Sequence, residues 1–453
     1  YRHATRMPEA YWREALRRDA GDSRCRLALG RWHLRRGEFD TAETHLRAAI
    51  SRLTARNANP YDGEAYYQLG RCLRHLGRDT EAYDALAKAT WNEAWASAAH
   101  HALAEIDCTR QAWPAARDHL EGCLQLNAEN LRARDLLAIV LRRLGRADEA
   151  TALLRDTLVR DPLDWWARHL AGQGDTRRHE RHRPADLACD TQTRLDLAHD
   201  CARAGLFAEA LDILGNAQPE PTSGTSPILE YTRAWLAARL GRSAAAAGFL
   251  RAAARAPSDY CFPARLEEIA ILRFAIARSP DDARAPAYLG HLLYDRRRHR
   301  EAVGWWRRAV RLDPGNSVAW RNLGIAFYNV LRRPAAARRA YERAFAANPD
   351  DARLLFERDQ LWKRLGTAPA RRLRELERHR PLVDRRDDLS VELCALYNQT
   401  GRSVNALQIV RTRRFQPWEG GEGQALGQHV RTHLLLGRAA LAAGDAAGAR
   451  GHM

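Results

Sequence analysis

The chain has 453 residues, of which 45% are hydrophobic and 28% are charged, and its formal net charge is +17. This balance is ordinary for a water-soluble protein, and no apolar run reaches the roughly 18 residues that a membrane-spanning helix needs. Alanine, leucine and arginine dominate, and no alternating run of apolar and polar residues suggests a β-sheet. Because no signal peptide is visible either, we expect a cytoplasmic protein built of helices alone.

A spaced pattern of small residues recurs along the chain from its first third onward. Leu69-Gly70 is followed seven residues later by Gly77, and then by Ala82 and Leu86. A Gly inside a helix lets a neighbouring helix approach closely, and a Gly at a helix end readily takes the left-handed conformation. A small residue five positions further on suits a close helix crossing. The same spacing returns near residues 29–49, 289–314 and 323–349.

The pattern marks the ends of helices as well as their contacts. Glycines are expected to end the first helix of a pair at residues 37, 77, 145, 205, 241, 366, 401 and 444, whereas the unit near Gln111 lacks this Gly. Prolines at 162, 280, 314 and 349 are expected to follow second helices, because Pro cannot donate the helical hydrogen bond. A pair of antiparallel helices repeated about every 34 residues is the signature of the tetratricopeptide repeat (TPR). We therefore predict an all-α, right-handed TPR-type α-solenoid of about 11–12 partly degenerate repeats.

The predicted superhelix occupies the whole chain, 1–453, without a domain boundary, because repeats resume after each interruption. The chain starts without Met and inside the repeat pattern, so we expect it to be a fragment of a longer protein. In chain order we predict N-terminal repeats (1–170), a polar loop (171–185), central repeats (186–256), an aberrant unit whose first helix is missing or recast as a loop (257–280), and C-terminal repeats (281–453) with an inserted loop near 413–423.

The eight cysteines are scattered and form no CxxC pair, which is typical of small hydrophobic residues in the helix cores of a protein from a reducing cytoplasm. His100-His101 with Asp107 and Cys108 comes nearest to a set of metal ligands. Adjacent histidines on a helix point to different sides, so they do not bind one ion together. We expect no metal and no cofactor.

The positive charge is almost entirely arginine, since lysine occurs only at positions 88 and 363. Many arginines alternate with Asp and Glu along the predicted helices, as in 17–19 and 385–388, which favours a solvated surface of ion pairs. An anionic partner, whether an acidic protein, a sugar phosphate or a nucleic acid, remains the alternative interpretation.

Some segments depart from the repeat pattern, and candidate binding residues lie there. Trp91 and Trp95 are four residues apart, as are His101 and Glu105, so each pair would share a helical face, with His100 next to it. A Trp pair often packs in a protein core, but Trp together with His and Glu is also typical of a sugar-binding surface.

Two later segments carry similar groups. The aberrant unit contains Tyr260, Phe262 and Arg265 in an expected loop, where packing demands are weaker. The Pro-Trp-Glu-Gly-Gly-Glu-Gly loop presents an aromatic ring and two carboxylates at Trp418, Glu419 and Glu422. Two carboxylates can act as acid and base, yet nothing in the sequence shows that they face each other, and an insertion that braces the solenoid explains the loop equally well. We assign no catalytic residue.

The strings outside the generic repeat positions resemble the C-terminal TPR region of bacterial proteins that join a galactose-mutarotase-like domain of unknown function to a long TPR array. The shared strings lie at residues 59–67, 89–95, 102–108, 161–168, 259–269 and 417–423. The resemblance implies a carbohydrate-related role for a parent protein, because mutarotase-like domains commonly bind or process sugars. It covers the solenoid alone, so no catalytic residue is carried over.

Three hypotheses follow. The chain is a scaffold that binds a partner protein or the missing mutarotase-like domain of its own parent, and is not itself an enzyme. Alternatively, it contributes residues to a sugar site of a carbohydrate-processing parent, which requires the candidate residues to converge on one concave patch. The third hypothesis is a polyanion or nucleic-acid binder, which requires a continuous arginine stripe free of acidic neighbours.

Overall fold

The computed structural model describes residues 8–172, 190–215, 225–257 and 261–452, and these residues form helices and turns without a strand. The predicted all-α fold is therefore confirmed. Within the described ranges, none of the helices combines the length and the hydropathy that crossing a bilayer requires. The chain divides into two compact units, Tyr1–Ala302 (unit 1) and Val303–Met453 (unit 2), with the division inside α17 (His299–Leu312).

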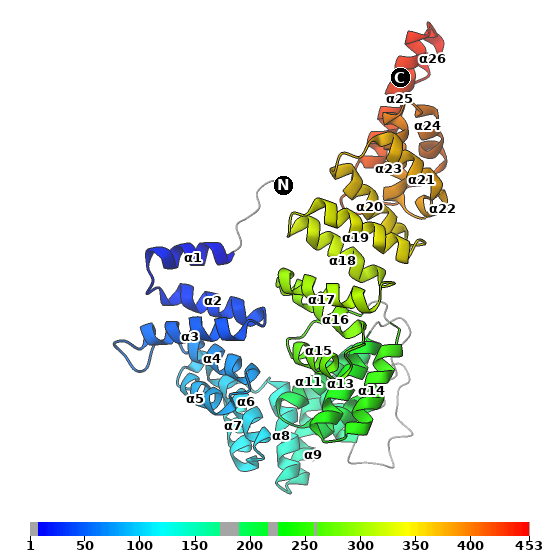
Figure 1. Cartoon of the computed structure of the whole chain (residues 1–453). Helices are drawn as coiled ribbons and strands as arrows, with labels where there is room; N and C mark the ends of the chain where they lie inside the picture. The colour runs from blue at the N-terminus through cyan, green and yellow to red at the C-terminus, as the bar shows by residue number, and fades with distance from the viewer. Residues whose placement is uncertain (1–7, 173–189, 216–224, 258–260, 453) are drawn as a thin grey trace. The chain divides into compact units, whose positions relative to one another are not determined.

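Unit 1 is a succession of helices that follow one another along the ribbon (Figure 1). Its helices are α1 (Pro8–Arg18), α2 (Ser23–Arg35), α3 (Phe39–Leu53), α4 (Glu64–His75), α5 (Asp79–Ala89), α6 (Glu93–Thr109), α7 (Trp113–Leu126), α8 (Leu131–Arg143), α9 (Ala147–Arg160), α10 (Trp165–Gly172), α11 (Thr191–Arg203), α12 (Phe207–Gly215), α13 (Ser226–Arg239), α14 (Ser243–Arg255), α15 (Glu267–Arg278), α16 (Arg284–Asp295) and the first residues of α17.

The glycines of the Leu-Gly pairs lie where two helices of a pair meet. A Cβ atom at Gly70 of α4 would lie 2.5 Å from Cγ of Leu86 on α5, and one at Gly30 of α2 would lie 2.6 Å from Cγ of Leu46 on α3. Both leucines are fully buried in one apolar core that α2 to α6 share. The interpretation that Gly permits close approach of the paired helices is confirmed at these positions.

The turns between paired helices are left-handed, as the glycine spacing predicts. The unit without a Gly has Gln111 at this turn with a φ of 59°, a conformation that costs a side chain about 1 kcal/mol or more. Arg297 and Arg332 also have a positive φ, of 61° and 53°, at later turns between paired helices. The predicted glycines, at 37, 77, 145, 205, 241, 366, 401 and 444, have φ between 72° and 79°.

Turns that are far apart in the sequence contact each other within unit 1. Arg298, just before α17, donates a hydrogen bond to the backbone carbonyl of Gly37 over 2.8 Å, and Arg36 donates to the carbonyl of Arg297 over 3.3 Å. A Cβ atom at Gly205 would lie 2.9 Å from Cα of Thr109, so the turn after α11 lies against the end of α6. The repeats before α8 and those after α10 are thus joined through their turns.

The predicted interruptions are only partly described. Residues 173–185 of the predicted polar loop lie outside the described residues. In the described part of the aberrant unit one helix is present, α15, which follows residues without helical structure at 261–265.

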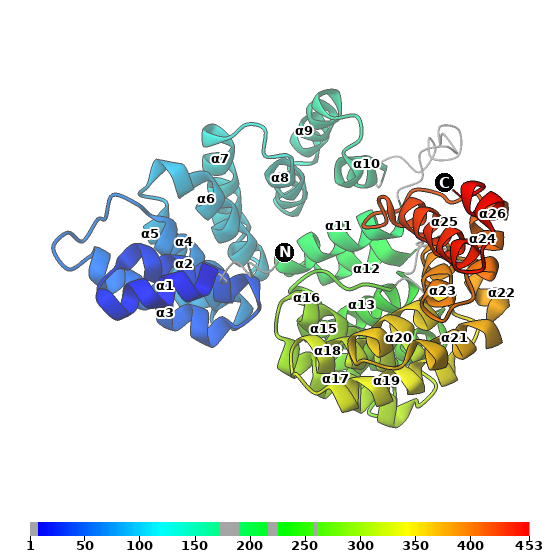
Figure 2. The ribbon, with the colours of Figure 1, turned by 90° about the horizontal axis from the view of Figure 1, so that it is seen from above.

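Unit 2 continues with hairpins of helices. Figures 1 and 2 show α18 and α19 lying antiparallel and side by side, in agreement with their extensive contact. Its core joins α19, α20, α21, α22, α23 and α24 around buried residues such as Leu355 and Leu393. The helices are the remainder of α17, α18 (Ser317–Asn329), α19 (Pro334–Ala347), α20 (Ala352–Arg364), α21 (Pro369–Arg378), α22 (Arg380–Val383), α23 (Asp387–Gln399), α24 (Ser403–Thr412), α25 (Gln424–Ala442) and α26 (Ala446–Arg450).

Candidate functional site

The predicted tryptophan pair does not share a helical face, which corrects the sequence analysis. Helix α6 begins only at Glu93, because Asn92 before it has extended backbone angles, and Trp91 therefore lies in the preceding turn. The Trp91 side chain is 67% exposed, with Nζ of Lys88 3.6 Å from the ring centroid. Trp95 stacks on Tyr67 with ring centroids 5.1 Å apart, and its Nε1 donates to Asp62 over 3.2 Å.

The two adjacent histidines point to different partners, as predicted. Nδ1 of His100 lies 2.9 Å from Nδ1 of His119 on α7. His101 lies 3.6 Å from the carboxylate of Glu105, one turn further along α6. Burial lowers the pKa of both His100 and His101, so both side chains are neutral near pH 7. Within the part of the chain that the structure describes, no cluster of three or more His, Cys, Asp or Glu side chains could hold a metal ion.

Glu105 is buried inside an ion-pair network instead of facing a groove. It pairs with Arg74 of α4 and lies 3.4 Å from Arg203 of α11. Burial by itself raises the pKa of Glu105, but the charges of Arg203 and Arg74 bring the pKa below its ordinary value. The carboxylate therefore stays ionised and fully engaged.

Arg265 enters the same network from the residues that precede α15. Its guanidinium group bonds Asp196 over 2.9 Å and Asp200 over 3.3 Å, and Asp200 bonds Arg203 over 2.7 Å. The structure thus brings His101, Glu105 and Arg265 together across four elements. Every one of these charges has an opposite charge beside it. The network therefore links α4, α6, α11 and the residues before α15 and, among the described residues, leaves no unpaired charge for a ligand to bind within it.

The other candidates of unit 1 stay outside this network. The Phe262 side chain is 71% exposed, and Tyr260 lies outside the described residues. Of the unit 1 candidates, the structure therefore gathers two from α6 and one from the aberrant unit, and leaves the exposed rings of Trp91 and Phe262 unassociated with them.

The inserted loop of unit 2 folds on itself. A Cβ atom at Gly421 would lie 1.9 Å from the Trp418 ring, so this Gly is what allows the indole to cover the backbone. The carboxylate of Glu422 accepts a hydrogen bond from the backbone N–H of Gly420 over 3.2 Å, and Glu419 is exposed. Asp387, at the start of α23, anchors the loop by accepting from Gln416 N–H and from Arg413. These contacts hold the inserted loop against the start of α23.

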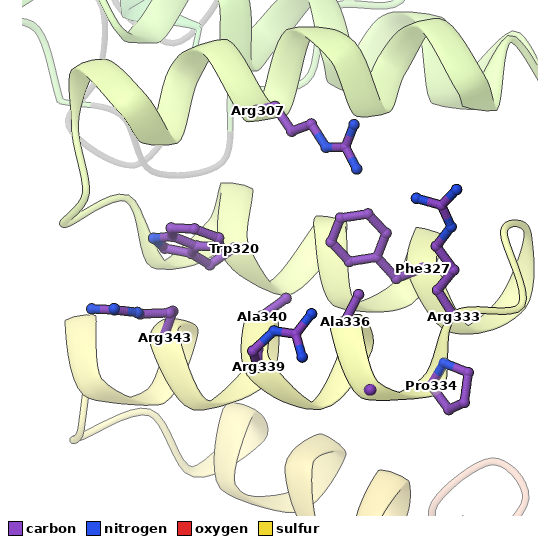
Figure 3. Close-up of a pocket in the computed structure, with 10 residues that line it drawn as sticks. Arg307, Trp320, Phe327, Arg333, Pro334, Ala336, Arg339, Ala340 and Arg343 are labelled. Atoms are coloured by element: carbon purple, nitrogen blue, oxygen red, sulfur yellow. The ribbon is translucent and has the colours of Figure 1, made fainter.

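A groove that the sequence analysis missed lies on unit 2 between the second helices α17 and α19, above the first helix α18 (Figure 3). Its volume is about 670 Å³. The floor consists of Trp320 and Phe327 of α18 and the alanines of α19, and Nε1 of Trp320 donates to the carbonyl of Pro314, which fixes the ring. The lining residues are Arg307, Trp320, Phe327, Arg333, Pro334, Ala335, Ala336, Arg339, Ala340 and Arg343.

Four exposed arginines surround this floor, and we call the feature the arginine groove. In Figure 3 Arg307 extends from α17 above Phe327, while Arg333, Arg339 and Arg343 extend from α19 and the turn before it. Among the described residues, none of the four makes an ion pair. Arg321, on the neighbouring part of α18, by contrast bonds Glu357 over 2.6 and 2.5 Å.

A signal for this groove is present in the sequence. Between residues 302 and 341 the only acidic residue is Asp313, whereas arginines occupy positions 307, 308, 311, 321, 332, 333, 338 and 339. Alternation of charges elsewhere in the chain obscured this segment. Which of these arginines share one groove follows only from the packing of three helices.

Comparison with known proteins confirms the repeats. The sequence profile of the family described as tetratricopeptide repeat matches residues 27–99, 269–317 and 289–333. The first match runs from within α2 to the first residues of α6, and the other two together reach from within α15 to the turn after α18. These segments are therefore tetratricopeptide repeats, and α18, which forms the floor of the arginine groove, is one of their helices.

Two solved structures are among those similar to this chain. The structure titled "Structure of Naa15/Naa10 bound to HypK-THB" is 14% identical, covers 96% of this chain and 70% of its own, and has a TM-score of 0.27. The structure titled "Crystal structure of MamA protein" is 15% identical, covers 46% of this chain and 93% of its own, and has a TM-score of 0.29.

Proposed function

We infer that this chain is a protein-interaction scaffold, a TPR solenoid that acts by binding a partner protein. The observation that carries this proposal is the arginine groove, where four exposed guanidinium groups, which have no carboxylate partner in the described part of the chain, surround an apolar floor. Several neighbouring arginines of unit 2 are by contrast neutralised within the chain, as Arg358 is by Glu342 and Glu375. A surface that combines uncompensated charge with apolar area is typical of a binding site for another molecule.

The partner that we propose is the mutarotase-like domain of the same parent protein, as the resemblance of the sequence implies. A solenoid exposes long surfaces along its repeats, and such surfaces commonly hold another domain. Support also comes from the exposed aromatic rings of Trp91 and Phe262 on unit 1, since exposed aromatic side chains are frequent anchors of protein interfaces.

The alternative, in which the chain lends residues to a sugar site, has less support. It relied on Glu105 and His101, and both are enclosed by the ion-pair network of unit 1. Glu419 and Glu422 are exposed, but Glu422 is engaged with the backbone of its own loop. We expect the purified chain to hydrolyse no glycoside, and turnover that Glu419→Gln or Glu422→Gln abolishes would contradict this expectation.

The test of the scaffold proposal is a titration between two separately purified proteins. The reading frame is extended upstream of Tyr1, the domain that it encodes is expressed alone, and its binding to this chain is measured by isothermal titration calorimetry. We expect a Kd of about 1 μM or tighter, which corresponds to roughly 8 kcal/mol of binding free energy. A reading frame without such a domain, or two proteins that do not associate, contradicts the proposed partner.

A further inference from the structure

We propose that the arginine groove binds an acidic segment of a partner protein, whose carboxylates pair with Arg339, Arg343 and Arg307 while an apolar side chain enters the floor. The proposal rests on the scaffold function and names the chemistry of the partner. It places recognition on the side of the solenoid formed by the second helices α17 and α19, whereas the sugar-site alternative required the candidate residues to converge on one concave patch.

The charge of the groove selects for carboxylates. A guanidinium group presents a planar fork of N–H donors that matches the two oxygens of a carboxylate. In the adjoining part of unit 2 this pairing is satisfied within the chain, since Arg372 bonds Asp359 over 2.9 Å and Glu392 over 2.7 Å. The four arginines of the groove lack such partners among the described residues, so an acidic ligand would complete the pairing that the neighbouring helices already show.

The spacing of the arginines defines a matching peptide. Arg339 and Arg343 are one turn apart on α19, which separates their positions by about 6 Å along the helix axis. Alternate residues of an extended peptide are separated by about 6.6 Å, and residues four apart on a helix by about 6 Å. A segment with glutamates at either spacing can therefore engage both arginines at once.

The floor favours a protein segment over a nucleic acid. Stacking of a base needs the exposed face of an aromatic ring. Phe327 is only 7% exposed, and the guanidinium carbon of Arg307 lies 5.3 Å from its ring centroid, above the ring. Trp320 is half-buried with its indole N–H bonded to the backbone. What stays accessible is carbon surface between the alanines of α19, which suits an aliphatic side chain.

The test measures fluorescence anisotropy of labelled probes with the full chain. The first probe is a short peptide of alternating glutamates around a central leucine, the second replaces the glutamates with glutamine, and the third is an oligothymidylate of equal charge. The key variant is Arg339→Ala/Arg343→Ala. Its control is Arg374→Ala/Arg378→Ala, which removes the same charge, also one turn apart, from the second helix α21. Circular dichroism verifies that both variants fold.

We expect the acidic peptide to bind the unaltered chain, the glutamine peptide to bind at least tenfold more weakly, and the Arg339→Ala/Arg343→Ala variant to lose about tenfold in affinity for the acidic peptide. The Arg374→Ala/Arg378→Ala variant should bind as the unaltered chain does. Equal binding of both peptides, or equal losses in both variants, overturns the proposal. Tighter binding of the oligothymidylate with the same arginine dependence also overturns it, in favour of a nucleic-acid ligand.

The scaffold proposal and the groove proposal can each be refuted without refuting the other. If the upstream domain binds in calorimetry but the acidic peptide does not bind here, the groove assignment is wrong and the scaffold function stands. If the peptide binds through Arg339 and Arg343 but the upstream domain does not, the groove assignment stands and the proposed partner is wrong.

Discussion

The close contact between the Leu-Gly pair and the next helix predicts that one Gly→Ala substitution has opposite effects at two positions. Gly70 lies inside α4, where a Cβ atom would approach Cγ of the buried Leu86 to 2.5 Å and the carbonyl oxygen of Ala82 to 3.2 Å. Gly304 lies inside α17, is exposed, and a Cβ atom there would meet no other atom within 4 Å. Both glycines lie inside helices, and the two positions differ in the room that the surrounding atoms leave for a side chain.

The magnitudes follow from two terms. Replacing a helical Gly by Ala gains about 1 kcal/mol of helix propensity at either position. At Gly70 the added Cβ atom also forces Cγ of Leu86 and the backbone of α5 to move. Overpacking of this kind costs about 1–3 kcal/mol. We therefore expect Gly304→Ala to stabilise α17 by about 1 kcal/mol, and Gly70→Ala to leave α4 and α5 between about 0 and 2 kcal/mol less stable.

Hydrogen exchange followed by mass spectrometry measures these effects locally, which matters because repeats of a solenoid can unfold separately. Protection of peptides from α4 and α5 is compared between the unaltered chain and Gly70→Ala, and protection of α17 between the unaltered chain and Gly304→Ala. The propensity gain is common to both variants, so their difference isolates the cost of the contact. Protection of α4 that rises as much as that of α17 would refute the close-approach role of the Leu-Gly pair.

Three further predictions concern stability. Burial raises the pKa of Glu268 to about 7, so the folded chain binds this proton more tightly than the unfolded chain, and this carboxyl should lower the unfolding free energy by about 3 kcal/mol as pH rises from about 4.5 to above 7. Denaturant titrations across this range should show that Glu268→Gln removes this contribution from the pH dependence, and a pH dependence unchanged by the substitution would contradict the assignment. Arg203→Met leaves the buried carboxylate of Glu105 short of one cation, although Arg74 still pairs with it, and should cost about 1–3 kcal/mol in the exchange protection of α6 and α11. Arg24→Met, at a 93% exposed side chain, should cost almost nothing, and similar losses in both variants would refute the role of the network. Gln111→Gly relieves a left-handed side-chain conformation and should raise the unfolding free energy of α6 and α7 by about 1 kcal/mol, and a variant less stable than the unaltered chain would show that the turn is not strained.

The fold was predictable because the repeat imposes local requirements that single residues reveal. A left-handed turn needs Gly, and the predicted glycines take that conformation. Close helix contact needs the absence of a side chain, and Gly30 and Gly70 supply it. The start of α6 was misplaced because the tryptophan spacing suggested a helix, whereas Asn92 breaks it with an extended backbone.

The candidate site was less predictable because its properties depend on which charges meet in space. Glu105 and His101 look like binding residues in the sequence, but Arg74 and Arg203, which lie 31 and 98 residues away from Glu105, enclose the carboxylate. The arginine groove is the opposite case, because the sequence analysis did not name its residues as binding residues. Its arginines look like an ordinary solvated surface, and only the packing of α17, α18 and α19 shows which of them share one groove.

The central claim is that this chain recognises an acidic protein segment on the second-helix side of unit 2. The most direct measurement is photocrosslinking of the acidic peptide, with a benzophenone side chain in place of its central leucine, to the full chain, followed by mapping of the adducts by mass spectrometry. The account predicts adducts confined to the floor and walls of the arginine groove, at Trp320, Phe327 and the facing residues of α17 and α19. Adducts centred on the first-helix residues Tyr67 and Trp95, or spread evenly over the chain, would contradict it.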